Sequence, residues 1–161
     1  MSVKDALAIA LGLVLSLPFP SVLFIRVNAR RLERRRRAAR AAAHDALANA
    51  LTHYRRAELH YIRRRLGSPG TSAARDAHAA SFRERSAVQH ALFLLRTAST
   101  DPRIVALAER AFELTGLIHD ASTLEEATRD AARADQAVRD FVTATGATVH
   151  PTTARTELRD P

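Results

Sequence analysis

The sequence predicts an all-α protein. We expect an N-terminal transmembrane helix that continues into a long rod, and an antiparallel four-helix bundle formed by the rod's distal half and three further helices. Residues 6–25 contain no charged side chain, which favours a membrane segment. Alanine and arginine, both strong helix formers, dominate the chain, while the aromatic residues that favour strands make up 5% of it. Gly and Pro are scarce, at five and six residues.

The first predicted element is a single membrane span over residues 6–25, within an N-terminal domain 1–25. Twenty helical residues rise about 30 Å, the thickness of a bilayer's hydrocarbon core. Two prolines inside the span predict a kink, because each removes a backbone donor. Small residues four positions apart allow a second membrane helix to approach closely. The candidate residues for helix packing in the membrane are Gly12, Ser16, Pro18 and Pro20.

A basic juxtamembrane helix, residues 26–42, follows the span. Its arginine collar consists of Arg26, Arg30, Arg31, Arg34, Arg35, Arg36 and Arg37. Three interpretations stay open for these cations: charge that only sets membrane topology, contacts with anionic lipid headgroups, and contacts with nucleic-acid phosphates. The collar has no aromatic residues for stacking bases, which disfavours single-stranded nucleic acid. Residues 26–66 carry a net charge of +10, whereas residues 67–161 carry −2.

The same arginines predict the orientation. The short N-terminal flank carries only Lys4 and Asp5, so the positive-inside rule places the N-terminus outside and the C-terminal domain in the cytoplasm. We therefore expect a single-pass protein of the cell membrane. The alternative is a secreted helical domain released by cleavage after Ala29, since Val27-Asn28-Ala29 resembles a signal-peptidase site. The length of the apolar run and the arginines around the site favour the uncleaved anchor.

Apolar spacing predicts the rod. No Gly or Pro occurs between residues 27 and 66, so the anchor helix is expected to continue without a break. Its distal half carries apolar residues at three- and four-residue steps, which predicts a buried stripe. The stripe consists of Ala43, Leu47, Ala50, Leu51, Tyr54, Tyr61, Ile62 and Leu66. The turn-forming residues 67–70, Gly-Ser-Pro-Gly, end this helix.

Two further helices are predicted from their caps. Thr71 or Ser72 caps a second helix that runs to about Ala98. Asp101 followed by Pro102 begins a third helix, because the carboxylate accepts from free backbone amides and the proline needs no donor. The third helix is expected to end near His119. The expected core positions of the second helix are Ala74, Ala77, Phe82, Val88, Ala91, Leu92, Phe93 and Leu95.

A capping box predicts the start of the fourth helix. It is made by Ser122, Thr123, Glu125 and Glu126. The apolar positions of this helix are Leu124, Ala127, Ala131, Ala134, Val138, Phe141 and Val142. Gly146 is its expected stop, so residues 43–146 form the predicted bundle, and the Thr-rich tail 147–161 is predicted to be disordered. Alanine-rich seams bury little apolar area, which makes a homo-oligomer plausible.

No motif for catalysis, a cofactor or a metal appears in the sequence. His53 and His60 are the one histidine pair on a common helix face, and Glu58 is poorly phased to join them. We therefore expect this histidine pair to be exposed beside Arg55 and Arg56, and we expect no metal, no cofactor and no enzyme. The distal rod arginines are better placed for an acidic partner. They are Arg55, Arg56, Arg63, Arg64 and Arg65.

A longer pattern resembles a known family. An N-terminal anchor and an arginine-rich helix precede an LLxxxSxDPxIxxLAxxAF-like stretch and a final helix ending in FV. The residues that carry the pattern are Leu94, Leu95, Ser99, Asp101, Pro102, Ile104, Leu107, Ala108, Ala111, Phe112, Phe141 and Val142. Over residues 5–145 the chain resembles the small KilB-like membrane proteins of actinobacterial plasmids and chromosomes. The resemblance implies a membrane accessory factor linked to plasmid transfer and assigns no functional residue. Together these features predict a non-enzymatic adaptor or assembly factor.

Overall fold

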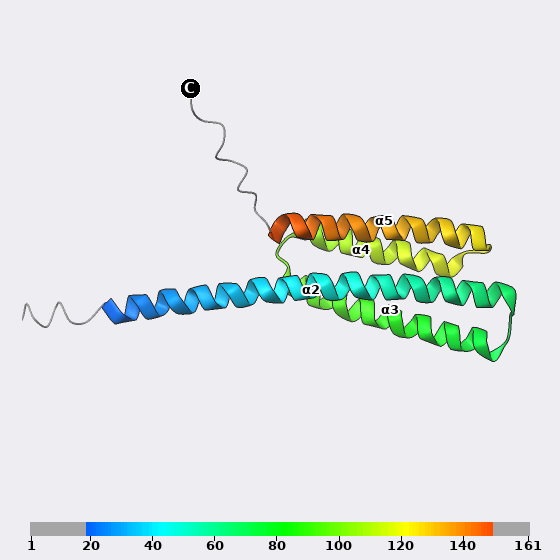
Figure 1. Ribbon diagram of the computed structural model, residues 1–161, viewed down its shortest axis with the longest axis horizontal. Coiled ribbons are helices and arrows are strands. Elements are labelled where there is room, and N and C mark those ends of the chain that lie inside the picture. Colours follow the sequence, from blue (N-terminus) through cyan, green and yellow to red (C-terminus); the bar gives the residue numbers. More distant parts are fainter. Residues whose placement is uncertain (1–18, 150–161) are drawn as a thin grey trace, which may run out of the picture. The chain divides into compact units, whose positions relative to one another are not determined.

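The regular structure of the described residues is helical throughout (Figure 1). The computed structural model describes residues 19–149, and side-chain exposure within residues 28–146. The elements are α2 (Phe19–Gly67), α3 (Ser72–Ala98), α4 (Pro102–Leu117), the 3₁₀ turn η1 (Ile118–Asp120) and α5 (Leu124–Val149). The predicted all-α class is confirmed. The predicted continuity of the rod from residue 27 to residue 66 is confirmed by α2, which has no break in this range.

The chain divides into two compact units, residues 1–38 and residues 39–161. The second unit is a helical bundle in which consecutive helices run in opposite directions (Figure 1). Its main core draws on α2, α3, α4 and α5, with Leu47, Leu51, Tyr54, Val88, Ala91, Leu92, Leu95, Ile104, Ala108, Ala111, Ala137 and Phe141. A single apolar cluster therefore ties the four helices together.

A second apolar cluster lies where α2, η1 and the first turns of α5 meet. Its buried members are Ile62, Ile118, Ala121, Ala127, Ala131 and Ala134. The alanines allow the helices to approach closely, because their side chains are short. Tyr61 and Leu114 pack against the cluster from its margin.

The predicted caps are confirmed by their hydrogen bonds. The Thr71 hydroxyl accepts from the Ala74 amide at 3.2 Å, and the Asp101 carboxylate accepts from the Arg103 amide at 2.9 Å. In the capping box, the Thr123 hydroxyl accepts from the Glu126 amide at 3.1 Å. The Glu126 carboxylate in turn accepts from the Ser122 amide at 2.8 Å and from the Ser122 hydroxyl at 2.9 Å. These bonds from Ser122 lower the pKa of Glu126.

Several apolar residues expected in the core are exposed. Phe82 and Phe93 of α3 are 51% and 60% exposed, and Leu66 and Val142 are also exposed. The reason in α3 is that large apolar residues occupy two opposite faces. The inward face carries Ala74, Ala77, Ser81, Val88, Ala91, Leu92 and Leu95. Periodicity alone does not tell which of the two faces meets the core.

The last helix extends beyond its expected stop. α5 continues past Gly146 to Val149, so the bundle's final helix includes residues that the sequence assigns to the tail. Glycine inside a helix costs about 1 kcal/mol relative to alanine, which weakens a helix without necessarily ending it. The remaining tail, residues 150–161, lies outside the described residues.

The predicted membrane span lies mostly outside the described residues. Gly12, Ser16 and Pro18 belong to the part that is not described. Pro20 lies in α2, which is described from Phe19 onward. Within residues 19–149, no helix combines the length and the apolar character needed to cross a bilayer.

Candidate functional site

The collar arginines whose side chains are described are all exposed. These are Arg30, Arg31 and Arg34 to Arg37, while the side chain of Arg26 lies outside the described part of α2. Among the described side chains, the one ion pair in the collar joins Arg37 Nε to Glu33 Oε1 at 3.1 Å. Because Glu33 engages one arginine, the other described guanidinium groups remain accessible to external anions.

One face of the collar has a shallow hollow. A surface depression of about 290 Å³ is lined by Asn28, Arg31, Leu32 and Arg35. Leu32 is 55% exposed, so the depression offers an apolar contact together with the two arginines that line it. This combination suits an amphiphilic anion better than a simple inorganic ion, because part of the ligand's contact area is apolar.

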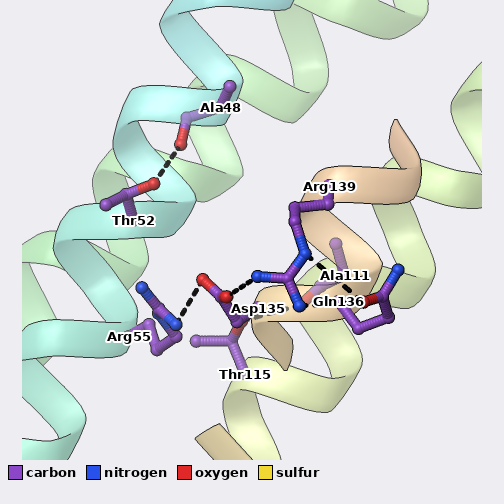
Figure 2. A network of polar contacts seen from close by, with 8 residues as sticks. All are labelled: Ala48, Thr52, Arg55, Ala111, Thr115, Asp135, Gln136 and Arg139. Carbon is purple, nitrogen blue, oxygen red and sulfur yellow. Dashed lines mark hydrogen bonds and ion pairs between the residues drawn. The ribbon is translucent and has the colours of Figure 1, made fainter. Parts of the chain in front are cut away.

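An ion-pair network connects α2 to α5 in the bundle (Figure 2). Arg55 of α2 pairs with Asp135 of α5, and Asp135 also pairs with Arg139 one turn further along α5. Arg139 Nη2 donates to Gln136 Oε1 at 2.8 Å. The expectation that Arg55 is available to an acidic partner is therefore wrong, because its guanidinium already pairs with Asp135 of the same chain.

Arg65 is engaged internally as well. Its Nη1 donates to the carbonyl oxygen of His119 at 3.1 Å, and its Nη2 donates to the carbonyl oxygen of Ala121. The first carbonyl belongs to η1 and the second to the residue that follows η1, so Arg65 links this turn to α2. The remaining distal arginines, Arg56, Arg63 and Arg64, are exposed. Of the five distal arginines that the sequence predicts to be available to an acidic partner, three are exposed in this way.

A buried carboxylate is the feature that sequence reasoning missed. Glu58 of α2 is 1% exposed. Its Oε1 accepts from the Ser81 hydroxyl of α3 at 2.5 Å, and its Oε2 lies 3.2 Å from Nδ1 of His119 in η1. A further hydrogen bond joins it to Tyr54 one turn earlier on α2. Burial and this carboxylate raise the pKa of Tyr54, so the phenol stays protonated and donates.

A group of rings adjoins this carboxylate through His119. Tyr61 stacks on His119 with ring centroids 5.1 Å apart, and His78 lies 4.7 Å from the Tyr61 ring. Phe82 meets His78 edge-on at 4.8 Å. The guanidinium of Arg65 lies over Tyr61, 5.6 Å from its centroid. The predicted exposure of His53 and His60 is confirmed, whereas His78 and His119 are half-buried and His44 is buried.

The cluster around Glu58 is a structural junction. Ser81 is 2% exposed, and its hydroxyl donates to the carboxylate, so it is unsuited to attack a substrate. In the described part of the chain, no three His, Asp or Glu side chains gather in a way that could hold a metal ion. The polar partners come from three elements, α2, α3 and η1. Their arrangement fixes where these elements meet.

A family model described as KilB plasmid transfer protein matches residues 41–149. The chain belongs to the KilB plasmid transfer protein family. The predicted resemblance is thereby confirmed for the bundle, while its N-terminal part, residues 5–40, lies outside the match. The searches of curated proteins and of solved structures found no match.

The KilB match covers the bundle and does not include the collar. It begins close to the boundary between the two compact units and ends with α5. The Glu58 junction and the exposed face of α3 lie inside the KilB region, whereas the collar precedes it. The family assignment therefore bears on the bundle.

Proposed function

We propose that this chain is a non-enzymatic accessory factor of plasmid transfer that acts as an adaptor or assembly factor at the cell membrane. The observation that carries the proposal is the KilB plasmid transfer match, which spans the whole bundle from α2 to α5. The non-enzymatic part of the proposal is supported by the buried polar groups around Glu58, which bond to one another. Ser81, Glu58 and Tyr54 are buried together and inaccessible to a substrate.

The membrane part of the proposal is supported by the sequence. Residues 6–25 carry no charge, and the collar that follows exposes its described arginines. A positive flank of this kind stays on the cytoplasmic side during insertion. We therefore propose a span at residues 6–25, a juxtamembrane helix at 26–42 and a cytoplasmic bundle that begins at residue 43 and ends with α5 at Val149, with the remaining tail also in the cytoplasm.

Protease protection tests this topology. A full-length chain with a C-terminal epitope is expected to lose the epitope in inside-out membrane vesicles and to keep it in intact spheroplasts. Loss of the epitope from spheroplasts would contradict both the orientation and the cytoplasmic adaptor. The intact mass of the mature chain is a second readout. A mass that corresponds to a chain starting at Arg30 would show that the protein is a cleaved, secreted domain instead.

A second candidate function is contact with anionic lipid headgroups through the collar. The depression lined by Asn28, Arg31, Leu32 and Arg35 favours it, because two arginines and an exposed leucine line it together. Each arginine near an anionic leaflet contributes about 1 kcal/mol. Several arginines acting together would hold α2 against the membrane surface.

A nanodisc comparison tests the lipid contact. The full-length chain is placed in phosphatidylcholine discs with and without phosphatidylglycerol, and hydrogen exchange is measured over residues 28–38. We expect slower exchange with phosphatidylglycerol in the wild type and in a variant with lysine at all seven collar positions, and no difference in a variant with glutamine at those positions. Equal exchange in both discs would exclude the lipid contact. Duplex DNA added to phosphatidylcholine discs provides a nucleic-acid arm, and protection only there would assign the collar to DNA.

A further inference from the structure

The outward face of α3 carries an uncharged row at three- and four-residue steps. The row, called the α3 seam below, consists of Ala79, Phe82, Ser86, Gln89 and Phe93, all of which are exposed. Phe82 and Phe93 lie about three helical turns apart on one face. The two other phenylalanines whose exposure is described, Phe112 and Phe141, are half-buried and buried in the core. The seam thus exposes two large rings on the face opposite the bundle core.

The spacing of the α3 seam is that of a helix-packing surface. Steps of three and four residues repeat the pattern by which one helix meets another along its length. Phe82 is also held from behind, because the His78 ring meets it edge-on at 4.8 Å. The Phe82 ring thus contacts the group of rings formed by His78, Tyr61 and His119.

Two polar, uncharged side chains lie between the rings. The Ser86 hydroxyl donates to the carbonyl oxygen of Phe82 at 3.0 Å, so its donor is already used within α3. Ser86 is also small and lets a second backbone come close. The Gln89 amide can both donate and accept, and a single polar residue within an apolar helix contact selects a register and a polar position on the partner. The seam therefore presents an apolar contact near each end and one polar contact between them.

Three exposed cations border the α3 seam: Arg75 at its N-terminal end, and Arg83 and Arg85 on its two flanks. At the other end, Arg96 is already paired with Glu109 of α4, with Nη2 to Oε1 at 2.6 Å. Of the two acids of α3, Glu84 lies on the opposite face, whereas the exposed Asp76 borders the row on the same flank as Arg83, so the border keeps a net positive charge. No ion pair within the described residues involves the three bordering cations. The seam is therefore uncharged along its centre and positive at its border.

We propose that the α3 seam binds an amphipathic helix of a partner protein whose apolar stripe is flanked by acidic residues. Charge complementarity selects this occupant, since carboxylates on the flanks would meet Arg75, Arg83 and Arg85 while leucine-like side chains cover Phe82 and Phe93. A second copy of the chain is disfavoured, because a two-fold axis through the middle of α3 would bring like-charged borders together. The proposal deepens the adaptor role and rests on it.

Two designed peptides of about 21 residues test the charge preference. Both carry leucine at the a and d positions, except for one central asparagine that faces Gln89, and their flanks carry glutamate in one and lysine in the other. Fluorescence anisotropy follows each labelled peptide as the full-length chain in phosphatidylcholine nanodiscs is added. We expect saturable binding of the glutamate peptide and about tenfold weaker binding of the lysine peptide, since several surface ion pairs together contribute about that factor.

Two sets of substitutions locate the binding. The double variant Phe82→Ser/Phe93→Ser should lose the glutamate peptide, whereas the matched variant Leu117→Ser/Leu124→Ser, which changes exposed apolar residues elsewhere, should bind it normally. Charge reversal at Arg75, Arg83 and Arg85 to glutamate should exchange the preference of the two peptides. Far-UV circular dichroism checks that each variant keeps its helix content.

Three results would overturn the proposal: equal binding of both peptides, no binding of either, or a preference that persists after charge reversal. A second copy as the occupant would also overturn it. The chain has no cysteine, so a Ser86→Cys variant in phosphatidylcholine vesicles reports this directly. Rapid oxidative dimerisation that Phe82→Ser/Phe93→Ser abolishes would assign the α3 seam to self-association. Failure of these tests leaves the topology result unaffected, so the two proposals fail separately.

Discussion

The arginines of the collar and those of the bundle have the same chemistry and different surroundings. In the collar, Arg34, Arg35 and Arg36 are exposed on a helix. In the bundle, Arg55 pairs with an aspartate of α5, and Arg65 donates to two carbonyl oxygens beyond α4. The comparison teaches that a high arginine content does not define a surface. The acceptor groups around each guanidinium decide whether it stabilises the fold or remains available to an external anion.

The acids show the same contrast. Glu33 in the collar bonds to one exposed arginine on its own helix, whereas Glu58 in the bundle is buried and bonded to side chains from α2, α3 and η1. An exposed pair on one helix contributes a few tenths of a kcal/mol. A buried carboxylate with several partners has a much larger effect when it is removed. Matched substitutions in the two regions therefore give unequal effects.

The largest difference is expected for apolar residues. Phe141 is fully buried and meets the His44 ring edge-on at 6.1 Å, so Phe141→Ala should lower the free energy of unfolding by about 4 kcal/mol. Leu32→Ala, in the exposed collar, should change it by less than about 0.5 kcal/mol. Urea unfolding of the full-length chain followed by circular dichroism measures both. Similar losses for the two variants would show that the collar is packed.

The acids come next. Glu58→Ala leaves Ser81, Tyr54 and His119 without their common acceptor, and we expect a loss of about 3 kcal/mol in the free energy of unfolding. Glu33→Ala should cost less than about 0.5 kcal/mol. Glu58→Gln keeps the shape and part of the hydrogen bonding, so its loss should fall between the two. A neutral effect of Glu58→Ala would mean that the junction contributes nothing to stability.

A smaller difference is expected between two arginines only one turn apart. Arg40 Nε donates to the carbonyl oxygen of Ala98 at the C-terminus of α3, at 3.1 Å, whereas Arg36 is exposed. Arg40→Ala should lower the free energy of unfolding by about 1 kcal/mol, and Arg36→Ala should leave it nearly unchanged. Thermal melts of both variants at one protein concentration measure this. A loss for Arg40→Ala and none for Arg36→Ala would show that the contacts stabilising the bundle begin between these two residues.

The smallest expected effect is a pH dependence of the free energy of unfolding. Burial lowers the pKa of His44, whose Nε2 is buried and meets no hydrogen-bond partner among the described residues. The folded state therefore resists protonation, while the unfolded chain takes up a proton near pH 6.5. Stability from this group is complete above that pH and falls as the pH drops below it. His44→Phe should remove this dependence, and His53→Gln, at an exposed position, should keep it. Unfolding measured from pH 7.5 to pH 5 compares the three chains.

Much of the fold could be predicted from the sequence, because local signals set it. The caps at Thr71, Asp101 and Thr123 depend on residues within one turn, and each forms as predicted. The exposed face of α3 could not be predicted. Phe82 and Phe93 and the inward stripe both follow helical spacing, and only the packing of α2 on α3 decides which face is buried.

The Glu58 junction could not be predicted for a related reason. Its partners Ser81 and His119 lie far along the chain, and no short motif connects them to Glu58. One signal was present in the sequence. Glu58 lies one turn from Tyr54 and from Ile62, both members of the predicted apolar stripe, so a carboxylate interrupts a buried face. Such an interruption predicts a buried acid that needs partners.

Plasmid transfer between cells tests the difference between the two regions most directly. Donor cells that lack the chain are complemented with the wild type, with Leu32→Ala or with Phe141→Ala, and transfer frequency is counted after mating. We predict that the wild type and Leu32→Ala restore transfer, while Phe141→Ala leaves it at the level of donors without the chain. Full transfer with Phe141→Ala, at a temperature where its bundle is unfolded, would contradict the proposal that the chain acts in plasmid transfer through its folded bundle.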